Sequence, residues 1–205
     1  MATDALVVPA NKGRKLPPEL LTPEEVRALL QACSPTAPTG IRNRALLVTL
    51  YRAGLRLEEA LALLPADVDA DEGVLRIGGD DGEEGRVAGI DAAALAIVGQ
   101  WLEVRAGLLL PKSSPLFCTL SGGPLQSAYV RQLLPRLAEK AGISKRVHAS
   151  GLRYTHAAEL AAEGLPVELI SAQLGHESLA STDRYLRRIP PKERIGALHR
   201  RQWSP

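Results

Sequence analysis

The chain has 205 residues and a mass of 21.9 kDa, which suits one domain, with or without a short tail, and leaves no room for two full domains. Apolar residues make up 45% of the chain but aromatic residues only 3%, so the core must consist of Leu, Ala and Val, which favours packed helices and argues against an all-β fold. The formal net charge of +2 is unevenly distributed, because residues 1–130 carry 12 Lys/Arg and 16 Asp/Glu whereas residues 131–205 carry 13 and 7. The basic C-terminal part is typical of proteins that bind a phosphate-bearing partner, although a solvated helix face explains the charge equally well.

Cysteine usage and hydropathy exclude several classes of protein. Cys33 and Cys118 stand far apart without the spacing of a zinc site or a disulfide framework, so we interpret both as buried apolar residues and expect no metal. No apolar run approaches the roughly 20 residues that a membrane span needs, and the N-terminus lacks a signal-peptide pattern. We therefore expect a cytoplasmic protein that does not contact membranes.

The first half of the chain begins with a tail and continues in helices. Residues 1–20 show no sustained periodicity and end near Pro17-Pro18, so they are interpreted as a tail or linker. Thr22-Pro23-Glu24-Glu25 predicts a helix with a capping box that ends near Cys33. A second helix is predicted from Ile41 to Tyr51, ended by Gly54, and a third begins at Leu57.

A short β-sheet is predicted in the middle of the chain. Residues 74–77 and 86–90 are apolar segments that flank an acidic, glycine-rich stretch, which indicates a hairpin with a long turn. Residues 115–118 are expected to add a third strand, after a helix capped by Asp91 that ends near Arg105. Further helices are predicted near residues 125–141, 150–163, 166–174, 178–188 and 191–202. The predicted fold is therefore mainly α with a small antiparallel three-stranded sheet.

Four segments together resemble the tyrosine recombinases, the family of phage integrases and chromosome-dimer resolvases. Residues 43–63, which contain Gly54-Leu55-Arg56, resemble the first arginine box of that family, and residues 147–157 resemble the second, usually written H-x-L-R-H-T. Gln173-Leu174-Gly175-His176-Glu177-Ser178 resembles its L-G-H-x-S box, and Tyr185 follows His176 by the nine residues that separate this histidine from the nucleophilic tyrosine. The resemblance covers about residues 20–203 and implies the family's catalytic-domain fold.

The resemblance implies a site made of Arg56, Arg153, His176 and Tyr185. The two arginines would bind the scissile phosphate, because a guanidinium remains charged and grips two oxygens at once. His176 would donate to a non-bridging oxygen, and Tyr185 would attack phosphorus to form a 3′-phosphotyrosine that preserves the bond energy for rejoining. Neither a metal nor another cofactor is implied. Taken singly, each of these residues is more often a solvated arginine, a capping histidine or a core tyrosine.

Two positions depart from the family pattern. Asp80 stands where the family has a hairpin lysine that protonates the leaving oxygen, and Ser150 stands where it has a histidine that helps to activate the tyrosine. An acid or base in position typically contributes about 10²–10⁴-fold, so cleavage is expected to be impaired while phosphate binding persists. Candidate substitutes are Arg76 or Arg86 in the hairpin and His148 or His156 near the tyrosine, although arginine is a poor proton donor.

The sequence therefore leaves two functions open. The first is a site-specific recombinase or integrase that cleaves and rejoins double-stranded DNA through Tyr185, with a topoisomerase-like relaxing activity as a variant. The second is a catalytically degenerate module that binds DNA or joins an active relative's complex. Residues 21–205 would form the catalytic domain and residues 191–202 a C-terminal helix, with no N-terminal core-binding domain. DNA binding would place the protein at the nucleoid, where it would self-associate or join an active recombinase.

Overall fold

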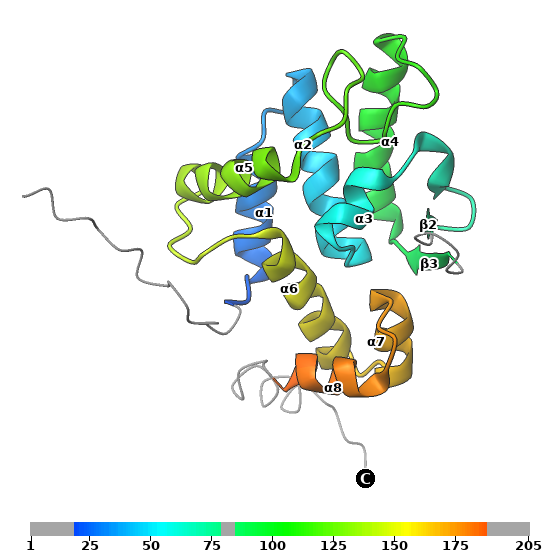
Figure 1. Cartoon of the computed structure of the whole chain (residues 1–205). Helices are drawn as coiled ribbons and strands as arrows, with labels where there is room; N and C mark the ends of the chain where they lie inside the picture. Colours follow the sequence, from blue (N-terminus) through cyan, green and yellow to red (C-terminus); the bar gives the residue numbers. More distant parts are fainter. Residues whose placement is uncertain (1–18, 79–84, 188–205) are drawn as a thin grey trace, which may run out of the picture.

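The computed structural model describes residues 19–78 and 85–187 of the chain, and its architecture is shown in Figure 1. The described part is mainly helical, with a three-stranded sheet at one side of the helices (Figure 1). The helical elements are α1 (Pro23–Gln31), α2 (Pro38–Val48), the π-helix η1 (Thr49–Ala53), α3 (Leu57–Ala62), the 3₁₀-helix η2 (Pro65–Asp67), α4 (Ala92–Gly107), α5 (Ser127–Lys140), α6 (Ala149–Ala162), α7 (Val167–Leu174) and α8 (Leu179–Leu186).

Local sequence signals account for several helix ends. Thr22 caps α1 through the predicted capping box, in which its hydroxyl accepts from Glu25 N–H at 3.2 Å and the Glu25 carboxylate accepts from Thr22 N–H at 2.7 Å. Asp91 caps α4 as predicted. Gly54 and Gly175 end η1 and α7 in the left-handed conformation that glycine adopts without steric cost.

The hairpin is confirmed, but the predicted third strand is wrong. Strands β2 (Val74–Ile77) and β3 (Arg86–Gly89) pair antiparallel, and the third strand is the short β1 (Val68–Asp69), which lies on the other edge of β2. Residues 115–118 contribute only an isolated bridge at Cys118. Leu116, Phe117 and Cys118 are all fully buried, and the backbone of Leu116 bonds to Leu63 O and to the Trp101 indole. A segment buried on every side and bonded to helices has neither a free edge nor an alternating face with which to extend the sheet.

Two apolar clusters organise the described residues. The large core joins α1 to α5, the sheet and the start of α6, with Trp101 and Phe117 among its largest buried side chains. A small cluster of Ala157, Ile170 and Leu174 joins the second half of α6 to α7 and α8, and Tyr185 packs against it. Helix α6 runs from the large core to the small cluster and so connects the two (Figure 1).

Several expectations on the ends of the chain can be compared with the described residues. Leu20 is buried and the Glu19 carboxylate accepts from Arg146 N–H at 2.7 Å, so these two residues pack on the domain rather than belonging to a tail. The helix predicted for residues 191–202 and residues 1–18 of the tail lie outside the described residues. Both cysteines are buried and unpaired, as predicted. Within the described ranges, no helix combines the length and apolar character needed to cross a bilayer.

Candidate active site

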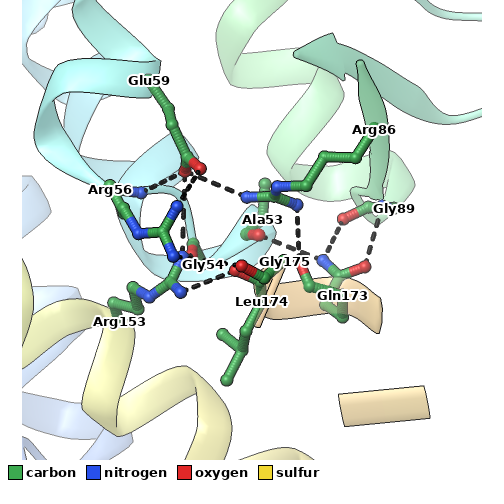
Figure 2. Close-up of polar contacts among 10 residues, drawn as sticks. All are labelled: Ala53, Gly54, Arg56, Glu59, Arg86, Gly89, Arg153, Gln173, Leu174 and Gly175. Carbon is green, nitrogen blue, oxygen red and sulfur yellow. Dashed lines mark hydrogen bonds and ion pairs between the residues drawn. The ribbon is translucent and has the colours of Figure 1, made fainter. Parts of the chain in front are cut away.

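The first arginine of the site stands at a sharp bend in the chain. The π-helix η1 ends at Gly54, and Arg56 then becomes the N-cap residue of α3, where its backbone N–H donates to the Glu59 carboxylate at 2.6 Å. The Arg56 side chain is 53% exposed and its Nη1 lies 3.2 Å from the same carboxylate. A π-helical turn beside a functional residue is a common arrangement, and here it directs the Arg56 guanidinium out of the core toward α7 (Figure 2).

The second arginine is buried where α6 crosses this bend. The Arg153 side chain is only 6% exposed, and its Nη1 donates to Gly54 O at 2.7 Å. Burial lowers the pKa of Arg153, while the neighbouring Tyr185 and Glu59 oppose that shift. The group stays cationic because an arginine does not lose its proton in proteins.

The end of α7 joins these arginines to the L-G-H box. Three arginines donate to three successive carbonyls there: Arg86 Nη1 to Gln173 O at 2.9 Å, Arg153 Nη2 to Leu174 O at 2.6 Å and Arg56 Nη2 to Gly175 O at 3.0 Å (Figure 2). The last carbonyls of a helix have no partner within the helix and carry its partial negative charge, so cations are favoured at this end. The helix end thus holds the three guanidinium groups close together.

His176 follows this helix end and is held by α8. Its Nδ1 lies 2.8 Å from the hydroxyl of Thr182, which is completely buried. Burial, and then the charges of the three arginines, lower the pKa of His176 to about 4. The ring is therefore neutral at pH 7, and the tautomer in which Thr182 donates to Nδ1 carries its proton on Nε2.

Tyr185 lies one turn beyond Thr182 on α8 and, like Thr182, contacts His176. Its ring stacks on Tyr154 with centroids 3.6 Å apart and an interplanar angle of 7°, and meets the edge of the His176 ring at 5.3 Å. The structure therefore brings together the four residues expected from the family boxes. Tyr185 packs against the small cluster, whereas Arg56 precedes α3, which packs in the large core.

The two hairpin arginines, both candidate substitutes for the lysine, have different positions. Arg86 on β3 reaches the site, where its Nη2 lies 2.9 Å from the Glu59 carboxylate (Figure 2). Arg76 on β2 instead pairs with Asp69 at 2.6 Å and is 55% exposed. The register pairs Ile77 with Arg86, so Arg86 shares the face of the sheet with the buried Ile77 while Arg76 points the other way.

The remaining candidates lie at the edges of the site. Asp80, in the hairpin turn, lies outside the described residues. Ser150 is exposed in the first turn of α6, and its hydroxyl is 3.0 Å from His148 Nδ1. The His148 ring caps α6, because its Nδ1 accepts from Gly151 N–H at 2.8 Å. This histidine therefore takes the place of the Ser, Thr, Asp or Asn that usually caps a helix.

His156 lies on the far side of the Gly54 turn. It is 3% exposed, neither ring nitrogen has a hydrogen-bond partner, and burial lowers its pKa to about 4. It lines a hollow of about 430 Å³ together with Arg52, Asp91 and apolar residues of α6 and α7. Its ring packs so closely on Gly54 that a Cβ there would approach it to 2.5 Å.

Sequence reasoning missed three residues that hold the site together. Glu59 binds all three arginines, Thr182 orients His176, and Gln173 bonds through its side-chain amide to both backbone groups of Gly89 and to Ala53 O. The spacing of Glu59 three residues after Arg56 was a signal for one of these contacts, because such pairs meet on a helix. Gln173 bonds residues that are far away in sequence, and Thr182 lies six residues after His176 on the next helix. Neither residue had a recognisable signal in the sequence.

Comparison with protein families gives a match over most of the chain. Residues 19–190 match the model of the phage integrase family. The tyrosine recombinase XerC of Halalkalibacterium halodurans is 34% identical over 191 residues, which cover 90% of this chain and 63% of that relative. XerD of Corynebacterium glutamicum is 34% identical over 183 residues, covering 87% of this chain and 60% of the relative. The chain thus spans less than two thirds of the length of these curated relatives.

Solved structures give the same result for the fold. The crystal structure of XerA recombinase matches with a TM-score of 0.80 at 25% identity, over 97% of this chain and 71% of that one. The post-cleavage complex of XerH recombinase with its palindromic difH substrate matches with a TM-score of 0.74 at 27% identity, over 89% of this chain and 53% of that one. The mainly helical fold with a three-stranded antiparallel sheet is therefore the fold of these recombinases' matching parts.

Proposed function

The chain belongs to the phage integrase family, and on that premise we propose that it cleaves and rejoins double-stranded DNA through Tyr185 as a site-specific recombinase. The observation that carries the proposal is the convergence of Arg56, Arg153, His176 and Tyr185 from four separate segments onto one surface. Two further observations support this function: the relatives XerC and XerD are tyrosine recombinases, and the similar XerH structure is a complex with its DNA substrate.

Arg56 and Arg153 bind the scissile phosphate in this proposal. Arg56 donates to one carbonyl and to Glu59, and Arg153 donates to two carbonyls, so each guanidinium, with its five N–H groups, has further donors for a phosphate oxygen. The burial of Arg153 strengthens its interaction with an anion, because water screens the charge less there. Because the guanidinium groups are fixed before the DNA arrives, no reorganisation is needed as charge develops on the phosphate.

His176 and Tyr185 carry the chemical step. The Tyr185 hydroxyl gives up its proton and its oxygen attacks phosphorus, so that a bond to the 3′-phosphate forms while the bond to the 5′ oxygen breaks. The departing 5′ oxygen takes up a proton and becomes a hydroxyl, so no net proton is gained or lost. The neutral His176 donates from Nε2 to a non-bridging oxygen. Attack by the 5′-hydroxyl of another strand on the phosphotyrosine reverses the step and releases Tyr185.

The departures from the family pattern favour a second candidate function. Ser150 cannot serve as a base at neutral pH, and His148, one candidate to replace the missing base, caps α6. Asp80 would repel a phosphate. A module that binds DNA but cleaves it slowly or not at all fits these residues, and would act by occupying sites or by joining an active relative.

Trapping of the covalent intermediate separates the two functions. The substrate is a duplex nicked close to the cleavage site, so that the short fragment released by cleavage diffuses away and cannot be rejoined. On this substrate a recombinase accumulates a covalent protein–DNA adduct, whereas a binding module gives only a non-covalent complex of retarded mobility. The adduct must be absent from Tyr185→Phe, which keeps the ring stack, and from Arg153→Ala. If the wild type forms no adduct but binds duplex, the degenerate module is the correct reading.

Binding itself has a separate test. We expect affinity for duplex DNA to fall steeply between ~50 and 200 mM salt, because bound phosphates release counterions. Salt-independent binding, or none at any salt, would refute the DNA function as a whole. Sedimentation with and without duplex would test the expectation from the sequence that the chain self-associates on DNA.

A further inference from the structure

Arg86 is bonded into the site as extensively as the two arginines of the family boxes. Its side chain is 20% exposed, its Nη1 donates to Gln173 O and its Nη2 to the Glu59 carboxylate, both at 2.9 Å. The guanidinium lies directly over Gly175, where a Cβ would approach its Nε to 2.2 Å (Figure 2). No lysine lies between Lys15 and Lys112, so the positive charge that the hairpin contributes here comes from the strand.

We propose that Arg86 is a positioning residue of the strand-cleavage site, which keeps the Glu59 carboxylate shared among three arginines and fixes the turn that carries His176. The inference rests on the proposed strand-cleavage function and adds a residue and a charge balance to it. Arg86 acts through Glu59 and the carbonyl of Gln173 rather than by touching the DNA.

The charge balance explains why sharing matters. The Glu59 carboxylate lies 2.9 Å from Arg86, 3.2 Å from Arg56 and 3.8 Å from Arg153. With three guanidinium groups and one carboxylate the cluster has a formal charge of +2, which matches the charge of a phosphodiester that has gained a second negative charge during attack. Without Arg86 the carboxylate would pair only with Arg56 and Arg153, and the cluster would fall to +1.

The second role concerns geometry. The carbonyl of Gln173 lies three residues before His176, and Arg86 is the side chain that satisfies it. The neighbouring carbonyls are held by Arg153 and Arg56, so loss of Arg86 frees one of the three attachments of the helix end. The positive charge of Arg86 also contributes to the lowered pKa of His176.

The test compares Arg86→Gln with Arg76→Gln, which removes the other arginine of the same sheet. We expect Arg86→Gln to slow adduct formation about 10²-fold, because a site group displaced by about 1 Å can cost that much, whereas Arg76→Gln should have little effect. The pKa of His176, followed by NMR of its ring protons in the absence of DNA, should rise in Arg86→Gln only. Such a rise would report the loss of the Arg86 charge beside His176.

A double variant tests the sharing directly. Adding Glu59→Gln to Arg86→Gln returns the cluster to +2, so we expect the double variant to cleave faster than Arg86→Gln alone. Slower cleavage in the double variant would refute the shared carboxylate. If Arg86→Gln does not fold, Arg86→Lys takes its place, since it keeps the charge but cannot reach both partners, and it should slow cleavage while leaving the pKa of His176 low.

These readouts separate this inference from the proposed function. If the wild type forms no adduct, the strand-cleavage function fails, but duplex affinity and the pKa of His176 still compare the two arginine variants. Equal values for Arg86→Gln and Arg76→Gln in both measurements would overturn the role of Arg86. A rise in the pKa together with weaker binding in Arg86→Gln alone would support it.

Discussion

Replacement of His156 by phenylalanine should stabilise the protein, and more so in acid. The ring is 3% exposed, both of its nitrogens lack hydrogen-bond partners, and burial lowers its pKa from the ordinary 6.5 to about 4. A buried polar group without a partner costs about 1–3 kcal/mol, so His156→Phe should gain about that much at pH 7. The adjoining hollow of about 430 Å³ offers room for the larger ring.

The pH dependence follows from the direction of the shift. The folded state keeps His156 neutral, whereas the unfolded chain binds a proton below pH 6.5, so unfolding is favoured as the pH falls from 6.5 to about 4. One pH unit corresponds to about 1.4 kcal/mol for one group, so His156 removes about 2 kcal/mol of stability between pH 6.5 and 5. His176, whose pKa is also lowered to about 4, is less buried and adds a smaller loss of the same sign, which the variant retains.

Urea unfolding at pH 7 and at pH 5 measures both effects. The difference in unfolding free energy between His156→Phe and the wild type should be larger at pH 5 than at pH 7 by about 2 kcal/mol. The pH 7 measurement serves as the control, because packing changes introduced by phenylalanine are the same at both values. An equal difference at the two pH values would refute the buried neutral histidine.

Three further predictions concern the site itself. Gly175→Ala should destabilise the protein by about 1–3 kcal/mol, because the residue has a φ of 61° and the Arg86 guanidinium lies where the Cβ would be. An unchanged thermal unfolding temperature would contradict this packing. Tyr154→Leu should slow adduct formation by loosening the stack on Tyr185, whereas Tyr154→Phe should preserve the rate, and equal rates for both would exclude the stack as a positioning device. Asp80→Lys with Ser150→His should raise cleavage at least ~10²-fold by restoring the family's proton-transfer groups, and no gain would mean that another group already supplies the proton.

The sequence was sufficient to predict the ends of helices that are fixed by neighbouring residues. The capping box at Thr22 and the cap at Asp91 appear as predicted, as does the end of the second helix at Gly54, since each depends on contacts between residues a few positions apart. The strand expected at residues 115–118 failed for the opposite reason. A short apolar run fits a buried strand and a buried loop equally well, and the neighbouring Trp101 and Leu63 decided between them.

The family boxes in the sequence identified Arg56, Arg153, His176 and Tyr185 as candidates, and gave the order of the elements that carry them. The tertiary structure decided how they are held, because Glu59, Gln173 and Thr182 act on residues of other elements. The tertiary structure also shows which of the two hairpin arginines reaches the site, Arg86 and not Arg76, which the sequence could not decide. In β3 the apolar Val87 would be expected to face the core, yet it is 55% exposed while Arg86 points inward.

The reason is physical. Alternation along a strand fixes which residues share a face but not which face is buried, and a run as short as residues 86–89 permits either register. The partners available on the inner face decide the orientation of β3. They are the Glu59 carboxylate on α3 and the Gln173 carbonyl at the end of α7, and both come close to β3 only when the helices pack. A buried guanidinium is stable only with such partners, so the place of Arg86 was settled by the fold rather than by its own segment.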